Sequence, residues 1–177
     1  MHIDQKYREN VTIQSYQSMP TIEGVSITEC QFFTDDGGNF AELFRLDNAQ
    51  VEKLEPAFTV KQVSFSVMVP NTIKAYHVHF KQEDLWFCSP FDRLLVNLHD
   101  IRQDSPTFDV HQRIVLGAGK HRMLRIPSGV AHGVANIYEK PMTLVYATSE
   151  QFLMHAPDEH RLPWDQFGTD VWELTKG

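Results

Sequence analysis

Short segments of strand-forming residues, separated by turn signals at intervals of about 8–12 residues, fill most of the chain. In the clearest one, 62–69, apolar residues occupy every second position: Val63, Phe65, Val67 and Val69. A period of two predicts a half-buried strand whose apolar side chains form the buried face. Helical periodicity is nearly absent, and its best candidate, 48–54, covers only about two turns. The pattern therefore predicts an all-β sandwich or barrel with short peripheral helices.

The length of 177 residues corresponds to about one domain of typical size. No repeat, linker or block of like charge divides the sequence, so we expect one domain over 1–177 with its core at about 25–165. A net charge of −7 argues against nucleic-acid binding. The sequence offers neither an apolar window of about 18 residues for a membrane span nor an N-terminal signal peptide. Two cysteines, Cys30 and Cys88, are too few for a disulfide framework, which predicts a cytoplasmic location.

Six of the nine histidines lie between His77 and His132. His77 and His79 are two residues apart on a predicted strand, so their side chains share a face, with Cα atoms roughly 6.7 Å apart. Glu83 follows, giving the spacing His-x-His-x3-Glu, and residues 127–136 read Pro-x-Gly-x2-His-x3-Asn around His132. The remaining histidines from 99 onwards are expected to be surface or turn residues: His99, His111, His121, His155 and His160.

The two spaced segments resemble the paired motifs of the cupin superfamily, whose members fold as jelly-roll barrels (double-stranded β-helices). In metal-binding cupins such residues supply three imidazoles and one carboxylate to Fe, Mn, Ni or Zn. The resemblance therefore implies a cupin jelly roll and, as one alternative, a metal site formed by His77, His79, Glu83 and His132.

A closer resemblance covers most of the chain and is to the dTDP-4-dehydrorhamnose 3,5-epimerase family, a family of dimeric cupins. Segments resembling the family occur in the family's order at 35–42, 74–77, 100–108, 125–133 and 163–165. The most specific pieces are Ser-Pro-Thr-Phe at 105–108 and Ile-Pro-x-Gly-x-Ala-His-Gly at 126–133. The stretch 77–83 is also similar to the dTDP-sugar 3,4-ketoisomerases.

This resemblance implies a role for several residues. His77 takes the place of the base that removes the proton next to the C4 ketone, and Lys74 that of a substrate-binding arginine. His132 is a second site residue, and Tyr146 is the candidate acid. The resemblance places Gln62 and Ser64 at the thymine base, with no redox cofactor required, and we assign His79 to substrate binding.

Three positions depart from the family's pattern. Gly37 replaces the arginine of the Asp-x-Arg-Gly turn, and Val145 replaces the strand tyrosine, with Tyr146 one place further on. A slip of one residue on a strand predicts that the ring of Tyr146 turns to the opposite face. The C-terminal aspartate that orients the family's catalytic histidine has no counterpart, and Glu83 is the candidate replacement.

These observations favour an epimerase or isomerase of a dTDP-4-keto-6-deoxyhexose, acting in deoxysugar or surface polysaccharide biosynthesis. The substrate is then a small sugar nucleotide, with neither nucleic acid nor membrane as a partner. Two alternatives stay open: a metal-dependent cupin enzyme, and a cupin that binds sugar nucleotides without catalysis. The resemblance also implies a homodimer with N-terminal strands at the interface, since the apolar strand at 31–33 would otherwise be exposed.

Overall fold

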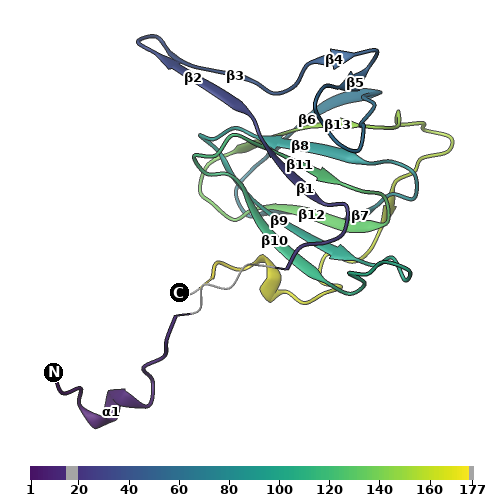
Figure 1. Cartoon of the computed structure of the whole chain (residues 1–177). Coiled ribbons are helices and arrows are strands. Elements are labelled where there is room, and N and C mark those ends of the chain that lie inside the picture. The colour runs from purple at the N-terminus through teal and green to yellow at the C-terminus, as the bar shows by residue number, and fades with distance from the viewer. Residues whose placement is uncertain (15–19, 176–177) are drawn as a thin grey trace.

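Two five-stranded antiparallel sheets face each other and enclose one barrel (Figure 1). The computed structural model describes residues 1–14 and 20–175. One sheet has the order β1-β11-β8-β13-β6, and the other has the order β10-β9-β12-β7-β14. Their strands are β1 (Ser26–Glu29), β6 (Gln62–Met68), β7 (Thr72–Val78), β8 (Asp84–Cys88), β9 (Arg93–Asp100), β10 (His111–Gly117), β11 (Arg122–Ile126), β12 (Val130–Asn136), β13 (Met142–Thr148) and β14 (His160–Arg161). This arrangement confirms the predicted all-β jelly roll.

The space between the sheets is an apolar core over much of its length. Alternate residues of β9 point inward, and Leu94, Val96 and Leu98 are completely buried there. They pack against inward residues of β11, including Leu124 and Ile126. Because a strand alternates its side chains between two faces, Leu95, between Leu94 and Val96, points outward and is buried in a separate cluster.

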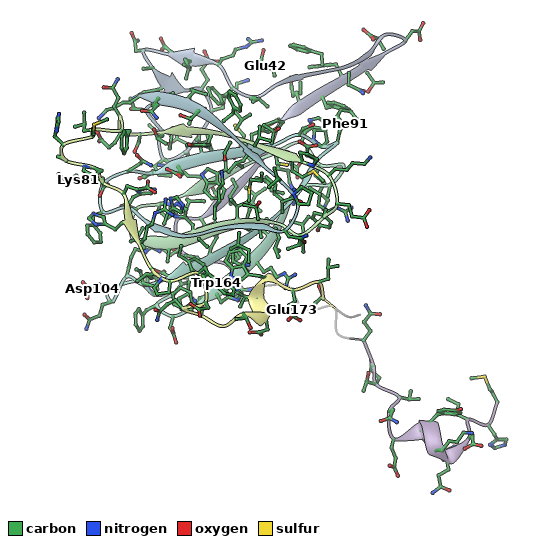
Figure 2. All side chains as sticks on the ribbon, turned by 180° about the vertical axis from the view of Figure 1, so that it is seen from behind. Glu42, Lys81, Phe91, Asp104, Trp164 and Glu173 are labelled. Atoms are coloured by element: carbon green, nitrogen blue, oxygen red, sulfur yellow. The ribbon has the colours of Figure 1, made fainter. Side chains whose placement is uncertain are left out.

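The C-terminal segment covers the outer face of the sheet that contains β9. After β14 the chain passes Trp164, forms a single 3-10 turn, η1 (Asp170–Trp172), and continues to Glu173 (Figure 2). Trp172 is buried against Tyr76 and Leu95, which point outward from the barrel. This outer layer gives the sheet containing β9 apolar contacts on both faces.

The N-terminal part forms two small hairpins beside the barrel. β2 (Gln31–Asp35) pairs with β3 (Gly38–Glu42), and this hairpin projects away from the barrel in Figure 1. The helix predicted at 48–54 is wrong, because β4 (Leu46–Asp47) and β5 (Gln50–Val51) pair there instead. Their two-residue turn, Asn48-Ala49, has φ values of 48° and 65°, which are incompatible with a right-handed helix. The remaining helix is α1 (Gln5–Arg8), and no described helix is long and apolar enough to span a membrane.

β6 occupies its predicted position, but the expected burial of its apolar face is wrong. The exposed fractions of its alternate side chains are 57% for Val63, 71% for Phe65 and 52% for Val67. The partly buried face carries Gln62, Ser64 and Ser66 instead. Periodicity located the two faces correctly, but it could not show that the inward face borders a polar cavity.

Candidate active site

A cavity of about 480 Å³ opens into the barrel between the two sheets. Its volume lies within the usual range for small-molecule sites, roughly 300–1,000 Å³. Its polar and aromatic lining comes from six strands and the segments that follow β7 and precede β14: Ser66, Lys74, His77, His79, Gln82, Asp84, Trp86, His132, Tyr146, Glu159 and Arg161. Titratable groups therefore converge in a cavity between the two sheets.

Three imidazoles lie together in this cavity, as the spacing of the motifs predicted. His77 on β7 and His132 on β12 are direct cross-strand partners, with ring centroids 5.9 Å apart. The ring of His79 lies 5.1 Å from that of His132 and 6.5 Å from that of His77. The structure thus places both predicted histidine segments in one site.

His77 is held by a carboxylate that the sequence analysis did not identify. Glu159 Oε1 lies 2.5 Å from His77 Nδ1, and Glu159 Oε2 lies 4.0 Å from His79 Nε2. The hydrogen bond from His77 lowers the pKa of Glu159, so this carboxylate is ionised at neutral pH. Glu159 therefore contacts and orients the ring of His77, and the predicted orienting residue, Glu83, does not, because Glu83 is bonded to Arg125.

The neighbouring residue, Asp158, fixes the other histidine. Its backbone carbonyl accepts a hydrogen bond from His79 Nδ1, and its carboxylate accepts the backbone N–H groups of residues 80–82 at 2.7–2.9 Å. Burial raises the pKa of Asp158, but these three N–H groups outweigh it and leave the pKa below its usual value. Residues 158 and 159 together determine the orientation of the His-x-His pair.

His132 is the most deeply buried member of the cluster. Its Nδ1 lies 2.9 Å from the carbonyl of Val130, which can only accept, so Nδ1 carries the hydrogen. Nε2 is buried and has no hydrogen-bond partner within the described chain, although Asp84 Oδ2 lies 3.7 Å away. Burial lowers the pKa of His132 to about 4, so the ring is neutral and presents an acceptor to the cavity.

Glu83 does not belong to this cluster, so the predicted ligand set His77, His79, Glu83 and His132 is wrong. The carboxylate of Glu83 accepts hydrogen bonds from Arg125 at 2.6 and 2.8 Å. Asp84, the next residue, points into the barrel instead, where it accepts from Gln82 at 2.8 Å and from Trp86 at 2.9 Å. Successive residues of an extended strand face opposite ways, so one position decides which carboxylate reaches the histidines.

Two overlapping groups of side chains could hold a divalent metal ion. They are His77, His79 and Glu159, and His79, Asp84 and His132, and the potential ligand atoms of each group lie within 4.8 Å of one another. The Nδ1 atoms of His79 and His132 both contact backbone carbonyls, so each ring directs Nε2 toward the group. His132 Nε2 has no hydrogen-bond partner within the described chain, whereas Gln82 Nε2 lies 3.3 Å from His79 Nε2 and would have to move aside for a metal. Metal-bound histidines commonly have such a contact at the other ring nitrogen, so the donor set is compatible with a metal.

The other predicted site residues come from both sheets: Lys74 from β7 in one, and Gln62, Ser64 and Tyr146 from β6 and β13 in the other. Lys74 lines the cavity and donates from Nζ to Ser66 Oγ at 2.5 Å. Gln62 and Ser64 lie on the inward face of β6, where Gln62 donates to Ser64 Oγ at 3.1 Å, but they do not line the cavity itself. Tyr146 does line it, so the expectation that its ring faces the other way is wrong. The inward face of β13 carries every second residue: Leu144, Tyr146 and Thr148. Ala147, on the other face, packs into a separate cluster with Leu85.

A jelly roll whose cavity gathers three histidines and two carboxylates is an enzyme-type cupin. The chain belongs to the dTDP-4-dehydrorhamnose 3,5-epimerase family, whose family model matches residues 20–172. This match confirms the resemblance found in the sequence and, with it, a nucleotide-sugar epimerase or isomerase.

Individual relatives agree with this assignment. The chain is 40% identical over 144 residues to the spore coat polysaccharide biosynthesis protein SpsL of Bacillus subtilis, covering 81% of this chain and 91% of SpsL. It is 30% identical over 147 residues to the probable low-salt glycan biosynthesis epimerase Agl13 of Haloferax volcanii, covering 83% and 91% of the two chains. Among solved structures, dTDP-4-dehydrorhamnose 3,5-epimerase of Bacillus anthracis, with TDP and PPi bound, is 25% identical and has a TM-score of 0.72. The similarity covers 86% of this chain and 87% of that one.

Proposed function

We propose that the protein epimerises or isomerises a dTDP-4-keto-6-deoxyhexose by removing a proton next to the C4 ketone. The single observation that carries this proposal is the contact between His77 and Glu159 inside a cavity of about 480 Å³. A carboxylate at Nδ1 fixes the ring and keeps the hydrogen on Nδ1, which leaves Nε2 as the base. The reaction serves deoxysugar or surface polysaccharide synthesis, and the name of SpsL, which describes spore coat polysaccharide biosynthesis for that relative, supports this role.

The enolate formed by proton loss needs a donor for its developing oxyanion. His132 is unsuited to this task, because its hydrogen is on Nδ1 and its free Nε2 can only accept. Lys74 carries three donors into the same cavity, so we assign it to the oxyanion and assign His132 to a substrate hydroxyl. His79, fixed by Asp158, contacts the sugar beside them.

Inversion at carbon requires the proton to return on the opposite face of the sugar. His77 comes from β7 in one sheet and Tyr146 from β13 in the other, and both line the cavity. A sugar bound between the two sheets therefore has the base on one side and a phenol on the other. We assign Tyr146 as the acid that returns the proton.

The nucleotide end of the substrate lies along β6. Gln62 and Ser64 continue the inward polar face from Ser66 at the cavity, and they offer an amide and a hydroxyl to a pyrimidine base. Arg161 is the other cationic side chain of the cavity lining beside Lys74, and a guanidinium suits a diphosphate.

We further propose that the protein is a homodimer. The apolar face of β6 is exposed at the edge of its sheet, and the hairpin β2–β3 exposes Phe32, Phe33 and Phe40. Such surfaces are usually covered in an assembly. Light scattering at micromolar concentration is expected to show a species of twice the chain mass, and a clean 20.5 kDa species would contradict the dimer.

We also propose a reducing, cytoplasmic setting for this enzyme. Cys30 and Cys88 are both free thiols. Burial raises the pKa of Cys88 to about 12, so this thiol stays protonated and unreactive. Neither cysteine contributes to the cavity lining.

Proton abstraction by His77 requires no metal or redox cofactor in this proposal. A metal-dependent reaction is the second candidate, favoured by the convergence of His79, Asp84 and His132. A bound divalent ion would polarise the substrate carbonyl as a Lewis acid. Elemental analysis of the wild type and of His79→Ala distinguishes the metal-free reaction from the metal-dependent one. Metal that is lost in the variant together with thermal stability supports the second candidate, and negligible metal in both proteins removes it.

Deuterium exchange tests the proposed function directly. Incubation with dTDP-4-keto-6-deoxyglucose in D2O is expected to place deuterium at C3, and at C5 as well if both centres are processed. His77→Asn keeps a polar side chain of similar size but removes the base, so it should slow exchange at least ~100-fold while nucleotide binding persists. Uptake by His77→Asn at the wild-type rate would exclude His77 as the base. Tight binding of the dTDP-sugar without exchange by the wild type would favour the non-catalytic alternative.

A further inference from the structure

The cavity has one apolar wall, in contrast to the charged groups around His77. Val134 on β12 and Leu144 on β13 line the cavity from opposite sheets, and their exposed fractions are only 4% and 3%. Trp86 on β8 lines the cavity as well. All three side chains also belong to the core between the sheets, so this apolar wall (Trp86, Val134 and Leu144) is where the core borders the cavity.

Strand pairing places the apolar wall directly behind the residue that we assigned to the oxyanion. Val134 is the cross-strand partner of Lys74, and Leu144 is the cross-strand partner of Ser66. Lys74 donates to Ser66 Oγ across the gap between the two sheets. β12 and β13 lie closer to the middle of their sheets than β7 and β6 do. A ligand that reaches past Lys74 therefore meets Val134 and Leu144.

The apolar wall can pack against a methyl group but gives a hydroxyl little to bond to. The side chains of Val134 and Leu144 contain no polar atom. β12 and β13 each have a neighbouring strand on both sides, so their backbone polar groups are mainly used within the sheets. The indole N–H of Trp86 already donates to Asp84 at 2.9 Å. A hydroxyl buried here loses its bonds to water without replacing them, whereas a methyl group gains from the burial.

The polar side of the cavity decides which neighbour of C4 faces this wall. In a 4-keto-6-deoxyhexose, C3 carries a hydroxyl and C5 carries the C6 methyl group. His132 lies two positions before Val134 on β12, and its Nε2 is an acceptor with no partner within the described chain. This acceptor suits the hydroxyl on C3. With the ketone oxygen at Lys74, the methyl group on the other side of C4 then lies against Val134 and Leu144.

We propose that the apolar wall determines specificity at C6: it accepts the methyl group of a 6-deoxyhexose and disfavours the hydroxymethyl group of an ordinary hexose. Val134 and Leu144 supply the contact, and Trp86 closes it from the side. This inference rests on the proposed function, since the orientation of the sugar follows from the places assigned there to the ketone and the diphosphate.

The first test compares dTDP-4-keto-6-deoxyglucose with dTDP-4-ketoglucose, which differs only by a hydroxyl on C6. Deuterium exchange should show a kcat/KM about 10–100-fold higher for the 6-deoxy sugar, because an apolar pocket discriminates by about this much against an added hydroxyl. Val134→Thr replaces one methyl group of the wall by a hydroxyl and should lower the ratio at least ~5-fold. When both substrates compete in one sample, the ratio does not depend on how much of the variant is folded.

Val96→Thr is the matched control. Val96 on β9 is the cross-strand partner of Val134, is completely buried in the core, and does not line the cavity. The same chemical change in the same sheet should lower stability but leave the substrate ratio within about 2-fold of the wild type. An equal fall of the ratio in both variants, or an unchanged ratio in Val134→Thr, would overturn the inference.

Calorimetry with dTDP-6-deoxyglucose and dTDP-glucose tests the apolar wall without turnover. The wild type should bind the 6-deoxy sugar at least ~5-fold more tightly, and Val134→Thr should reduce this preference. Equal affinities together with deuterium exchange would contradict the inference and leave the proposed function intact. A clear preference without exchange would contradict the proposed catalysis and keep the wall as the C6 subsite. Failure of both sugar nucleotides to bind would contradict both proposals.

Discussion

Two cross-strand histidine pairs lie on opposite faces of the same five-stranded sheet, with nearly the same internal geometry. His77 and His132 face the cavity, with ring centroids 5.9 Å apart and planes inclined by 23°. His99 and His111 face outward, with centroids 6.2 Å apart and planes inclined by 27°. The difference between the pairs therefore lies in what each pair faces.

The outer pair is enclosed by packing. His99 stacks on Phe167 with centroids 3.8 Å apart and donates from Nε2 to Asp109 at 2.9 Å. His111 Nε2 donates to Asn97 Oδ1, and Asn97 in turn donates to the carbonyl of Val171. The expectation that these histidines lie on the surface or in turns is wrong, because the C-terminal segment covers them. Their contacts attach that segment to the sheet.

The inner pair has unused hydrogen-bonding capacity facing a cavity. Within the described residues, His132 Nε2 is buried with no hydrogen-bond partner beside the cavity, and His77 is held at Nδ1. His99 Nδ1 of the outer pair is also buried without a partner there, but Phe167 covers that ring. Paired histidines thus become a candidate site when they border a space that a ligand can enter, and become structural when a side chain already fills that space. This comparison predicts that substitutions around the outer pair change stability, and substitutions around the inner pair change chemistry.

The largest effect is expected from removing the cover of the outer pair. Trp172→Ala deletes a buried indole that packs against Tyr76 and donates to the carbonyl of Trp164, so it should cost about 3–5 kcal/mol of unfolding free energy. Urea denaturation measures this loss, and Trp164→Ala is the control, because Trp164 is 45% exposed. Exchange per folded molecule should persist in Trp172→Ala. If Trp172→Ala lost deuterium exchange but kept its stability, the outer face would not be purely structural, and the contrast between the two faces of the sheet would be wrong.

Acidification should reveal the inner pair through stability. His132 has a pKa of about 4 in the folded chain and an ordinary value of 6.5, so only the unfolded chain gains a proton as the pH falls below 6.5. Folding then loses about 2–3 kcal/mol between pH 7 and pH 4.5. His111 also has a pKa lowered by burial, so it contributes in the same direction.

Urea titrations at several pH values test this, with His132→Gln as the comparison. The variant is expected to lose less stability on acidification, whatever its stability at pH 7. Stopping at pH 4.5 avoids the stability linked to Glu159, whose lowered pKa makes its contribution disappear mainly below that pH. An identical pH dependence in both proteins would show that His132 is not the buried group that resists protonation.

The sequence predicts the parts of the molecule that depend on local pattern. Period-two alternation located β6, and the two histidine motifs located His77, His79 and His132 in one site. Alternation also showed which residues of β6 share a face, but it did not show which face borders a cavity. For that reason the apolar face of β6 was expected to be buried, although the barrel turns its serines inward.

The missing parts of the site depend on pairing between distant segments. Glu159 and Arg161 reach His77 only because the two-residue strand β14 pairs with β7, and nothing in the local sequence of residues 158–161 reports that pairing. Likewise, Glu83 and Asp84 are adjacent carboxylates whose side chains point in opposite directions. Glu83 forms an ion pair with Arg125, whereas Asp84 lies beside His132. The adjacent acidic pair Asp158-Glu159 was the available signal, but many exposed loops contain such pairs.

A smaller loss is expected from substituting one outer histidine. His99→Gln removes the stack on Phe167 and should cost about 1–2 kcal/mol, with exchange retained. Its inner counterpart, His79→Gln, should lower the exchange rate at least ~10-fold, because His79 lines the cavity. Denaturation and deuterium uptake on both variants give the comparison. Equal exchange rates would place His79 among the structural histidines.

The smallest change in stability is expected where each pair meets its carboxylate. Asp109 holds His99 with a side chain that is 78% exposed, so Asp109→Asn should change the unfolding free energy by less than about 0.5 kcal/mol. Asn also tolerates the positive φ of 65° at this position. Glu159→Gln is the same neutralisation at His77 and should likewise be mild in stability, since Glu159 is partly exposed. Only Glu159→Gln should slow deuterium exchange, because only His77 faces the substrate. Equal exchange rates in Glu159→Gln and Asp109→Asn would show that the contact between His77 and Glu159 does not contribute to catalysis.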